Sequence, residues 1–231
     1  MRRALVLAVF LLGGCAADVR DQARFVGTAP VVGDYALPVR TFEDRRFDGV
    51  VRQRFDFSCG SAALATLLRY HYDYEVAEDR AFRGMWLRGD QAQIRQLGFS
   101  LLDMKRWLAT RGISADGYKV SLDQVAQTGV PGIALIVVRQ YRHFVVVKGV
   151  TATEVLVGDP SLGLIAMPRA AFQQAWNGIY FVVSQDQALA KTRFNAPSAW
   201  ASFGRAPIGG RFNDPVSQQL LLLTAPSRGE F

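Results

Sequence analysis

Apolar positions recur with helical spacing in the central part of the chain. After Cys59, the run "CGSAALATLLRYHY" places Ala and Leu at helical intervals, which predicts a buried helix. The segment "SLLDMKRWLATRG" predicts a second helix, because Ser100 and Asp103 match a capping box and Gly112 matches a helix end. A short third helix is predicted to start at Ser121 and to end at the glycine and proline that follow it.

Short runs rich in Val, Ile and aromatic residues then replace the helical pattern. Four strands are predicted, at residues 132–138, 143–150, 154–159 and 178–184. The first three are joined by short loops, so they should pair as antiparallel neighbours. Between the last two, "MPRAAFQQAW" predicts a helix with Pro168 at its first position. Helices followed by a sheet indicate the α+β class with segregated elements.

Residues 1–15 have the pattern of an export signal. Arg2 and Arg3 provide a positive start, "ALVLAVFLL" is an apolar core too short for a lasting membrane span, and "LLGGC" follows. This ending resembles a bacterial lipobox, in which the cysteine after the cut, here Cys15, receives lipid on its sulfur. Ordinary secretory cleavage near Ala17, which would discard Cys15, is the alternative. Either cleavage leaves the folded part with a single free thiol.

The rest of the chain divides by composition into three parts. Residues 16–40 carry Gly, Pro and mixed charge without periodicity, which suits a tether between lipid and domain. Residues 41–187 hold the predicted helices and strands and are enough to bury one core. Residues 188–231 are rich in Gly and Pro and receive no assignment. No later segment is long and apolar enough to cross a bilayer, so the expected membrane attachment is the N-terminal lipid.

The charge pattern argues against several classes of function. The chain carries a formal net charge of +7, but its basic residues are scattered among acids, which gives little reason to expect a nucleic-acid partner. An anionic lipid surface or an acidic partner fits such a diffuse balance better. The sequence has neither Cys and His clusters at metal-ligand spacing nor a phosphate-binding motif ending in Gly-Lys-Ser/Thr. No metal, nucleotide or other cofactor is therefore expected.

Cys59 is the first candidate for chemistry. It lies in the first turn of its predicted helix, where unpaired N–H groups and the helix dipole stabilise a negative charge such as a thiolate. The small residues Gly60 and Ser61 beside it are expected to let a substrate approach. The alternative is a free cysteine that packs as a small hydrophobic residue, which is common. A catalytic function therefore requires a base and a group that orients the base.

The chain has two histidines that could act as this base. His71 lies twelve residues after Cys59 in the same predicted helix, about three turns away, so it is expected to be a surface or packing residue. His143 opens the predicted strand "HFVVVKGV" after a polar stretch, where its side chain can project into a cleft. A hydrogen-bonded histidine at a strand end, without a catalytic function, is the alternative.

Two polar residues complete the predicted site. Asp159 ends the next strand, and in an antiparallel hairpin the end of one strand lies beside the start of the other. Asp159 is then adjacent to His143 and can hold its imidazole in one tautomer, although Asp-Pro also commonly starts a turn. Gln53 precedes Cys59 by six residues and can fold back over the helix start. Its amide is a candidate oxyanion donor beside the Cys59 N–H, and a solvated glutamine is the alternative.

Three motifs together, "QRFDFSCGSAALATLL", "HFVVV" and "VGDPSLG", resemble the cysteine peptidases that process double-glycine leaders, the bacteriocin-processing branch of the papain-like peptidases. The resemblance covers residues 47–186. It implies a papain-like fold, in which the helix with the nucleophile packs against an antiparallel sheet with the base. By position, Gln53 and Cys59 match the oxyanion donor and the nucleophile. His143 and Asp159 match the base and the residue that orients it.

The resemblance implies a cysteine peptidase that cleaves a polypeptide, after a Gly-Gly-like site, through a thioester. Many family members are the first domain of a membrane-spanning, ATP-driven exporter, whereas this sequence resembles a stand-alone, exported lipoprotein form. The expected location is the periplasm, with lipid anchorage to the inner or outer membrane. The expected partners are a polypeptide substrate and components of a secretion system for surface or amyloid fibre proteins. Two alternatives stay open: a non-catalytic docking or chaperone module with the same fold, and acyl transfer to an amine instead of water.

Overall fold

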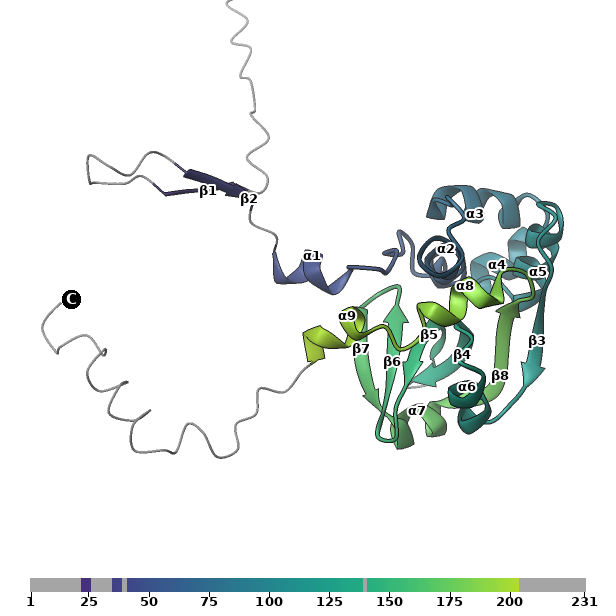
Figure 1. The fold of residues 1–231 in the computed structure, drawn as a ribbon. Helices are drawn as coiled ribbons and strands as arrows, with labels where there is room; N and C mark the ends of the chain where they lie inside the picture. Colours follow the sequence, from purple (N-terminus) through teal and green to yellow (C-terminus); the bar gives the residue numbers. More distant parts are fainter. Residues whose placement is uncertain (1–21, 26–34, 39–40, 139–140, 204–231) are drawn as a thin grey trace, which may run out of the picture. The chain divides into compact units, whose positions relative to one another are not determined.

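The structure is a computed structural model that describes residues 22–25, 35–38, 41–138 and 141–203 (Figure 1). Its contacts divide the chain into two units, residues 1–45 and residues 46–231. The first unit contains an antiparallel pair of strands, β1 (Gln22–Phe25) and β2 (Tyr35–Pro38), which α1 (Phe42–Arg46) follows in the chain. The predicted signal sequence with its lipobox cysteine, and most of the predicted tether, lie outside the described residues.

The second unit holds the elements on which the candidate site depends. Its helices are α2 (Cys59–His71), α3 (Glu78–Trp86), α4 (Gln91–Leu97), α5 (Leu101–Ala109), α6 (Leu122–Thr128), α7 (Arg169–Ala175), α8 (Gln187–Thr192), α9 (Pro197–Trp200) and a short 3-10 helix (Ala201–Phe203). Its strands are β3 (Ala115–Lys119), β4 (Gly132–Val138), β5 (Tyr141–Val150), β6 (Glu154–Asp159), β7 (Gly163–Pro168) and β8 (Trp176–Val183). Helices α2 to α5 precede the strands of the sheet in the chain, and the predicted α+β class is confirmed.

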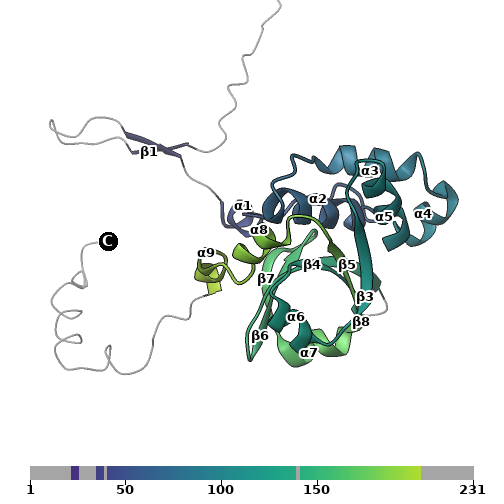
Figure 2. The ribbon, with the colours of Figure 1, turned by 45° about the vertical axis from the view of Figure 1, so that its right-hand side comes forward.

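Within the described residues, six strands of the second unit form one antiparallel sheet in the order β3-β8-β4-β5-β6-β7. The predicted antiparallel pairing of β4, β5 and β6 is thus confirmed. Helices α2 to α5 lie on one side of the curved sheet, and α6 and α7 lie on the other side (Figure 1, Figure 2). The sheet therefore has a hydrophobic core on each face.

Helix α2 is the centre of the larger core, and its apolar side chains are buried. Gly60 allows α5 to come close, because an added Cβ would lie 2.9 Å from Cε of Met104 and 3.0 Å from Cβ of Phe99. Ser61 is also buried, and its hydroxyl donates to the buried Glu78 carboxylate at 3.0 Å. The expectation that these two small residues admit a substrate is therefore wrong. Their size serves the packing of α2 against its neighbouring helices.

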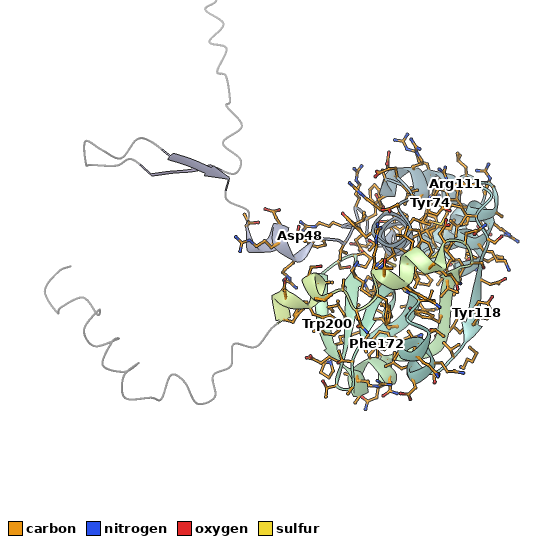
Figure 3. The ribbon with its side chains drawn as sticks, in the orientation of Figure 1. Asp48, Tyr74, Arg111, Tyr118, Phe172 and Trp200 are labelled. Carbon is orange, nitrogen blue, oxygen red and sulfur yellow. The ribbon has the colours of Figure 1, made fainter. Side chains whose placement is uncertain are left out.

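The smaller core lies on the opposite face of the sheet. Phe172 of α7 is fully buried there (Figure 3) and packs in one cluster with Val145 and Val147 of β5. Tyr180 of β8 joins this cluster, and its hydroxyl donates to the Val130 carbonyl at 2.9 Å. The buried hydroxyl of Tyr180 therefore has a hydrogen-bond partner. Alternate residues of β5 consequently pack into different cores, which fixes the orientation of this strand.

Most predicted elements are present, with shifted ends. Ser100 and Ser121 cap α5 and α6, each through a capping box. Strand β5 begins two residues before His143, and Pro168 is the cap of α7 instead of its first residue. The sequence pattern does not predict α3, α4, β3 or β7, although α3 is as long as the predicted α5 and β7 is as long as the predicted β6. Helices α8 and α9 occupy the start of the segment that the sequence left unassigned.

A buried lysine and histidine meet at the end of α2. His71 and Lys148 are 1% and 6% exposed, and Nζ of Lys148 lies 3.0 Å from Nε2 of His71. The same Nζ donates to the Gly49 carbonyl at 3.1 Å. Burial lowers the pKa of Lys148 to about 8, and burial followed by the charge of Lys148 lowers the pKa of His71 to about 2. His71 is therefore a packing residue, one of the two alternatives left by the sequence.

We expect Gly84→Ala to destabilise the fold by about 1 to 3 kcal/mol. Gly84 on α3 faces Trp107 on α5, and an added Cβ would overlap the indole of this buried side chain. Gly117→Ala is the matched control, because a Cβ at this position would meet only Ile179, at an ordinary 3.6 Å. Urea unfolding followed by tryptophan fluorescence measures both variants. Equal midpoints for the two would contradict the close packing of α3 on α5.

Candidate active site

Cys59 is the first residue of α2 and is 5% exposed. A turn over residues 55–58 leads into the helix. In this turn the Phe55 N–H donates to Oγ of Ser58, and the Ser58 N–H donates to the Phe55 carbonyl, both at 3.0 Å. The thiol thus lies at the first turn of a 13-residue helix, where backbone N–H groups have no partner within the helix. This backbone arrangement favours a negative charge on the sulfur.

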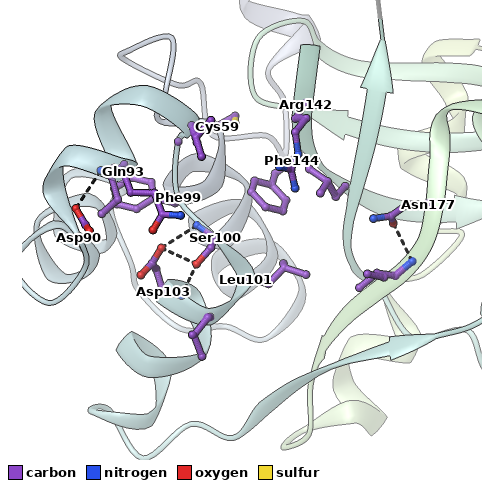
Figure 4. Close-up of a pocket in the computed structure, with 16 residues that line it drawn as sticks. Cys59, Asp90, Gln93, Phe99, Ser100, Leu101, Asp103, Arg142, Phe144 and Asn177 are labelled. Atoms are coloured by element: carbon purple, nitrogen blue, oxygen red, sulfur yellow. Dashed lines mark hydrogen bonds between the residues drawn. The ribbon is translucent and has the colours of Figure 1, made fainter. Parts of the chain in front are cut away.

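Two cavities meet at Cys59. The first has a volume of about 400 Å³ and lies between the α4–α5 region and the sheet. Figure 4 shows Cys59 on its helical side and Arg142 on its strand side. Its apolar wall is formed by Ile94, Leu97, Phe99, Leu101, Leu135, Phe144 and Ile179. The second cavity, of about 490 Å³, includes Asp56 and Tyr141 and shares Arg142 with the first. A peptide bound across the thiol would therefore contact both cavities.

Strands β5 and β6 bring His143 and Asp159 together. Their register pairs Val146 with Gly158, so Asp159 at the end of β6 lies beside the early part of β5. Nε2 of His143 is 2.9 Å from Oδ1 of Asp159, and the two residues are 6% and 4% exposed. The same oxygen accepts two backbone N–H groups of the following turn, at 2.7 and 3.1 Å. The carboxylate thus forms a turn and contacts the imidazole at once.

His143 and Asp159 each stabilise the charged form of the other. Burial lowers the pKa of His143, but hydrogen bonding and charge from Asp159 and Cys59 outweigh burial and raise it from 6.5 to about 9. Burial raises the pKa of Asp159, yet the hydrogen bond and charge of His143, with the two backbone N–H groups, hold it below its ordinary value. At neutral pH the pair is therefore an imidazolium and a carboxylate.

The second ring nitrogen of His143 is the one left for the thiol. Nδ1 is buried and has no hydrogen-bond partner among the described residues. Cys59 lies close enough to His143 to raise its pKa. The two side chains nevertheless form no hydrogen bond of good geometry in this conformation. Such contacts in catalytic sites are often long without substrate and shorten when it binds.

Gln53 lies in the segment that leads to the turn before α2. Its backbone N–H donates to the Pro160 carbonyl at 3.0 Å, which joins this segment to the turn after Asp159. Its side-chain Oε1 is buried and has no hydrogen-bond partner within the described part of the chain. Because buried polar atoms are usually paired, a merely solvated glutamine does not describe this residue.

Two further residues near the thiol have no signal in the sequence. Tyr141 and Arg142 begin β5, and both line the second cavity together with Cys59. Side chains alternate along a strand, so Tyr141 lies on the same face as His143. This alternation connects Tyr141 with the site. This rule applies only once the strand is known to begin at Tyr141.

The part of the chain that the structure describes contains neither a metal-ligand cluster nor a membrane-spanning helix. In these residues, no group of three or more His, Cys, Asp or Glu side chains is placed to hold a metal ion. None of the helices described here is both long enough and apolar enough to cross a membrane.

Comparison with known proteins gives a family match over most of the second unit. The model of the peptidase C39 family matches residues 48–188. Two relatives are each described as a probable functional amyloid protease FapD. The protein from Pseudomonas fluorescens is 40% identical over 185 residues, which are 79% of this chain and 80% of that protein. The protein from Pseudomonas aeruginosa is 38% identical over 183 residues, which are 78% of this chain and 79% of that protein.

The fold is similar to that of the peptidase domain of Streptococcus ComA, a bi-functional ABC transporter involved in a quorum-sensing pathway. The two are 20% identical, with a TM-score of 0.50, and the match covers 58% of this chain and 96% of that domain. At this identity the likeness concerns the fold alone. The predicted papain-like arrangement, with a helix packed on an antiparallel sheet, is confirmed.

Asp159→Asn should lower the pKa of His143 from about 9 towards or below 6.5, because burial remains while the negative partner is lost. NMR titration of the two histidine rings measures this, and His71, with a pKa of about 2, does not interfere. The raised pKa contributes stability that is fully present below pH 6.5 and is lost as pH rises through 9. The stability advantage of the wild-type protein over Asp159→Asn should therefore shrink over this range. A constant difference would contradict the ion pair.

Proposed function

The chain belongs to the peptidase C39 family and is a cysteine peptidase, and from this we propose that Cys59, His143 and Asp159 form its catalytic triad. The observation that carries the proposal is the 2.9 Å contact between Nε2 of His143 and Asp159. It leaves Nδ1 of the imidazole for the thiol, which lies where two cavities meet. A nucleophile, a base and a group that orients the base are the parts that acyl transfer requires.

The proposed reaction follows from the charges of these groups. The Cys59 thiolate attacks the carbonyl carbon of the scissile bond, and the negative charge moves to the carbonyl oxygen. The His143 imidazolium then gives its proton to the departing amine as the carbon–nitrogen bond breaks, which leaves a thioester on Cys59. Water loses a proton to the neutral imidazole and attacks the thioester, which releases the carboxylic acid and restores the thiolate. Asp159 orients the ring in both steps.

In this mechanism Gln53 and the Cys59 N–H stabilise the oxyanion. Two contacts support the assignment of Gln53, because they fix the segment that leads to its side chain. Lys148 binds the Gly49 carbonyl before it, and the Gln53 N–H binds the Pro160 carbonyl. Loss of one oxyanion donor typically slows turnover by about a hundredfold to a thousandfold.

The proposed substrate is an exported polypeptide that is cleaved after a Gly-Gly-like site. A thiol that is only 5% exposed favours small residues next to the scissile bond, since a bulky side chain would hold the carbonyl away from the sulfur. The relatives described as functional amyloid proteases support a setting in which fibre proteins are exported.

Wild-type protein should cleave a synthetic peptide with Gly-Gly before the scissile bond, and should cleave the same peptide with Val-Val much more slowly. Cys59→Ala and His143→Ala should each reduce cleavage by about a thousandfold or more, because the members of a triad act as a unit. Mass spectrometry of the products measures both effects. Cleavage by Cys59→Ala at the wild-type rate would contradict the proposal. If Cys59→Ala still supports export of the proteins encoded beside it, the docking-module alternative would be favoured.

We also propose that the mature protein faces the periplasm and is anchored by lipid on Cys15. The pattern of the first fifteen residues supports this, and a diffuse net charge of +7 is compatible with an anionic lipid surface. Wild-type protein expressed with radiolabelled palmitate should carry the label, and Cys15→Ser should not. Equal labelling of both proteins, or release of the wild-type protein into the soluble periplasmic fraction, would contradict the anchor.

A further inference from the structure

Tyr141 contacts the proposed base. It begins β5 two residues before His143, so both side chains lie on the same face of the strand. The ring centroids of Tyr141 and His143 are 5.9 Å apart, and the two planes are inclined by 34°. The tyrosine therefore covers one side of the imidazole, although it is itself 51% exposed.

The hydroxyl of Tyr141 reaches from the sheet to the helical side of the site. It donates to the Asp56 carbonyl at 2.7 Å, across a sequence separation of 85 residues. Asp56 lies in the turn over residues 55–58, which leads directly into Cys59 and is closed by its own hydrogen bonds. One side chain thus joins the strand that carries His143 to the turn that carries the nucleophile.

The groups around this hydroxyl keep it a hydrogen-bond donor. Burial, and then the negative charges of Cys59, Asp56 and Asp159, raise the pKa of Tyr141 above its ordinary value. The phenol therefore stays neutral at a pH below that at which His143, with a pKa of about 9, loses its proton. Two positive groups line the same cavity: Arg142, the next residue of the strand, and Arg95 of α4.

Only one nitrogen of the His143 imidazole has a hydrogen-bond partner in the described part of the chain, so the orientation of the ring depends on further contacts. Asp159 holds Nε2, whereas Nδ1 has no hydrogen-bond partner in the described part of the chain. A ring held at one atom can turn about that contact, which would carry Nδ1 away from the sulfur of Cys59. The Tyr141 ring obstructs this rotation from one side, and it also limits the access of water, which would screen the charges of the pair.

We propose that Tyr141 is a positioning residue that keeps His143 directed at Cys59 and fixes the separation between the two sides of the site. This inference rests on the proposed function, because Tyr141 acts through the Cys59–His143 pair. An exposed tyrosine can also make a surface hydrogen bond that has no consequence. If Tyr141 positions His143, its replacement lowers the reactivity of the Cys59 thiol. If Tyr141 only makes a surface hydrogen bond, its replacement leaves that reactivity unchanged.

The test measures the rate at which iodoacetamide alkylates Cys59 in the full chain as a function of pH, with mass spectrometry to assign the alkylated cysteine. The wild-type protein should react rapidly at pH 6 and show an inflection near pH 9, where His143 loses its proton. Tyr141→Phe keeps the ring but loses the hydrogen bond, so the rate at pH 6 should fall about fivefold. Tyr141→Leu also loses the ring, and its rate should fall by about tenfold or more. Its inflection should move to lower pH, because water then screens the charges that face His143.

Tyr118→Leu is the matched control for the loss of an exposed tyrosine. Tyr118 is also 51% exposed, but it lies on the edge strand β3 (Figure 3), and its replacement should change neither the rate nor the inflection. A folded Tyr141→Leu protein, checked by circular dichroism, with the wild-type rate and inflection would overturn the inference and leave the triad intact. A wild-type thiol that reacts at pH 6 no faster than that of His143→Ala would instead refute the proposed function.

Discussion

The contact between His143 and Asp159 depends on the register of one hairpin. Strands β5 and β6 are paired so that Val146 faces Gly158, and a slip of one residue would turn His143 to the other face of the sheet. Both side chains are nearly fully buried, so an ionised form of either requires the other beside it. Because valines of β5 pack into the cores on both faces of the sheet, hydrophobic packing holds the register and thereby maintains the ion pair.

Cys59, the proposed nucleophile, belongs to a different layer from His143, the proposed base, so the segment before α2 has to be fixed against the sheet. Three hydrogen bonds join it to β5 and to the turn after β6: Lys148 to the Gly49 carbonyl, the Gln53 N–H to the Pro160 carbonyl, and the Tyr141 hydroxyl to the Asp56 carbonyl. Each bond uses a backbone group of the segment, so its position depends little on the identity of its side chains. The same segment thus aligns both Gln53 and Cys59 with His143.

Sequence patterns identify local features of this protein better than contacts between distant segments. The helix that starts at Cys59 and the cap at Ser100 are predicted, because periodicity and capping are local properties. The function of Gly60 in packing depends on α5, about forty residues later, and no local pattern shows it. Tyr141 lies in a polar stretch before the strand that the pattern predicts, so its contact with Asp56 becomes visible only in three dimensions.

The family match ends at residue 188, but the folded structure continues beyond it. Ala190 and Phe194 are buried, one in each core. The Asn195 N–H donates to the Lys148 carbonyl at 2.9 Å, next to the irregularity in the β5–β6 ladder. A recombinant fragment trimmed at the family boundary would expose part of both cores to solvent and leave a carbonyl of β5, the strand that carries His143, without its donor. Expression boundaries for this peptidase therefore belong after α9.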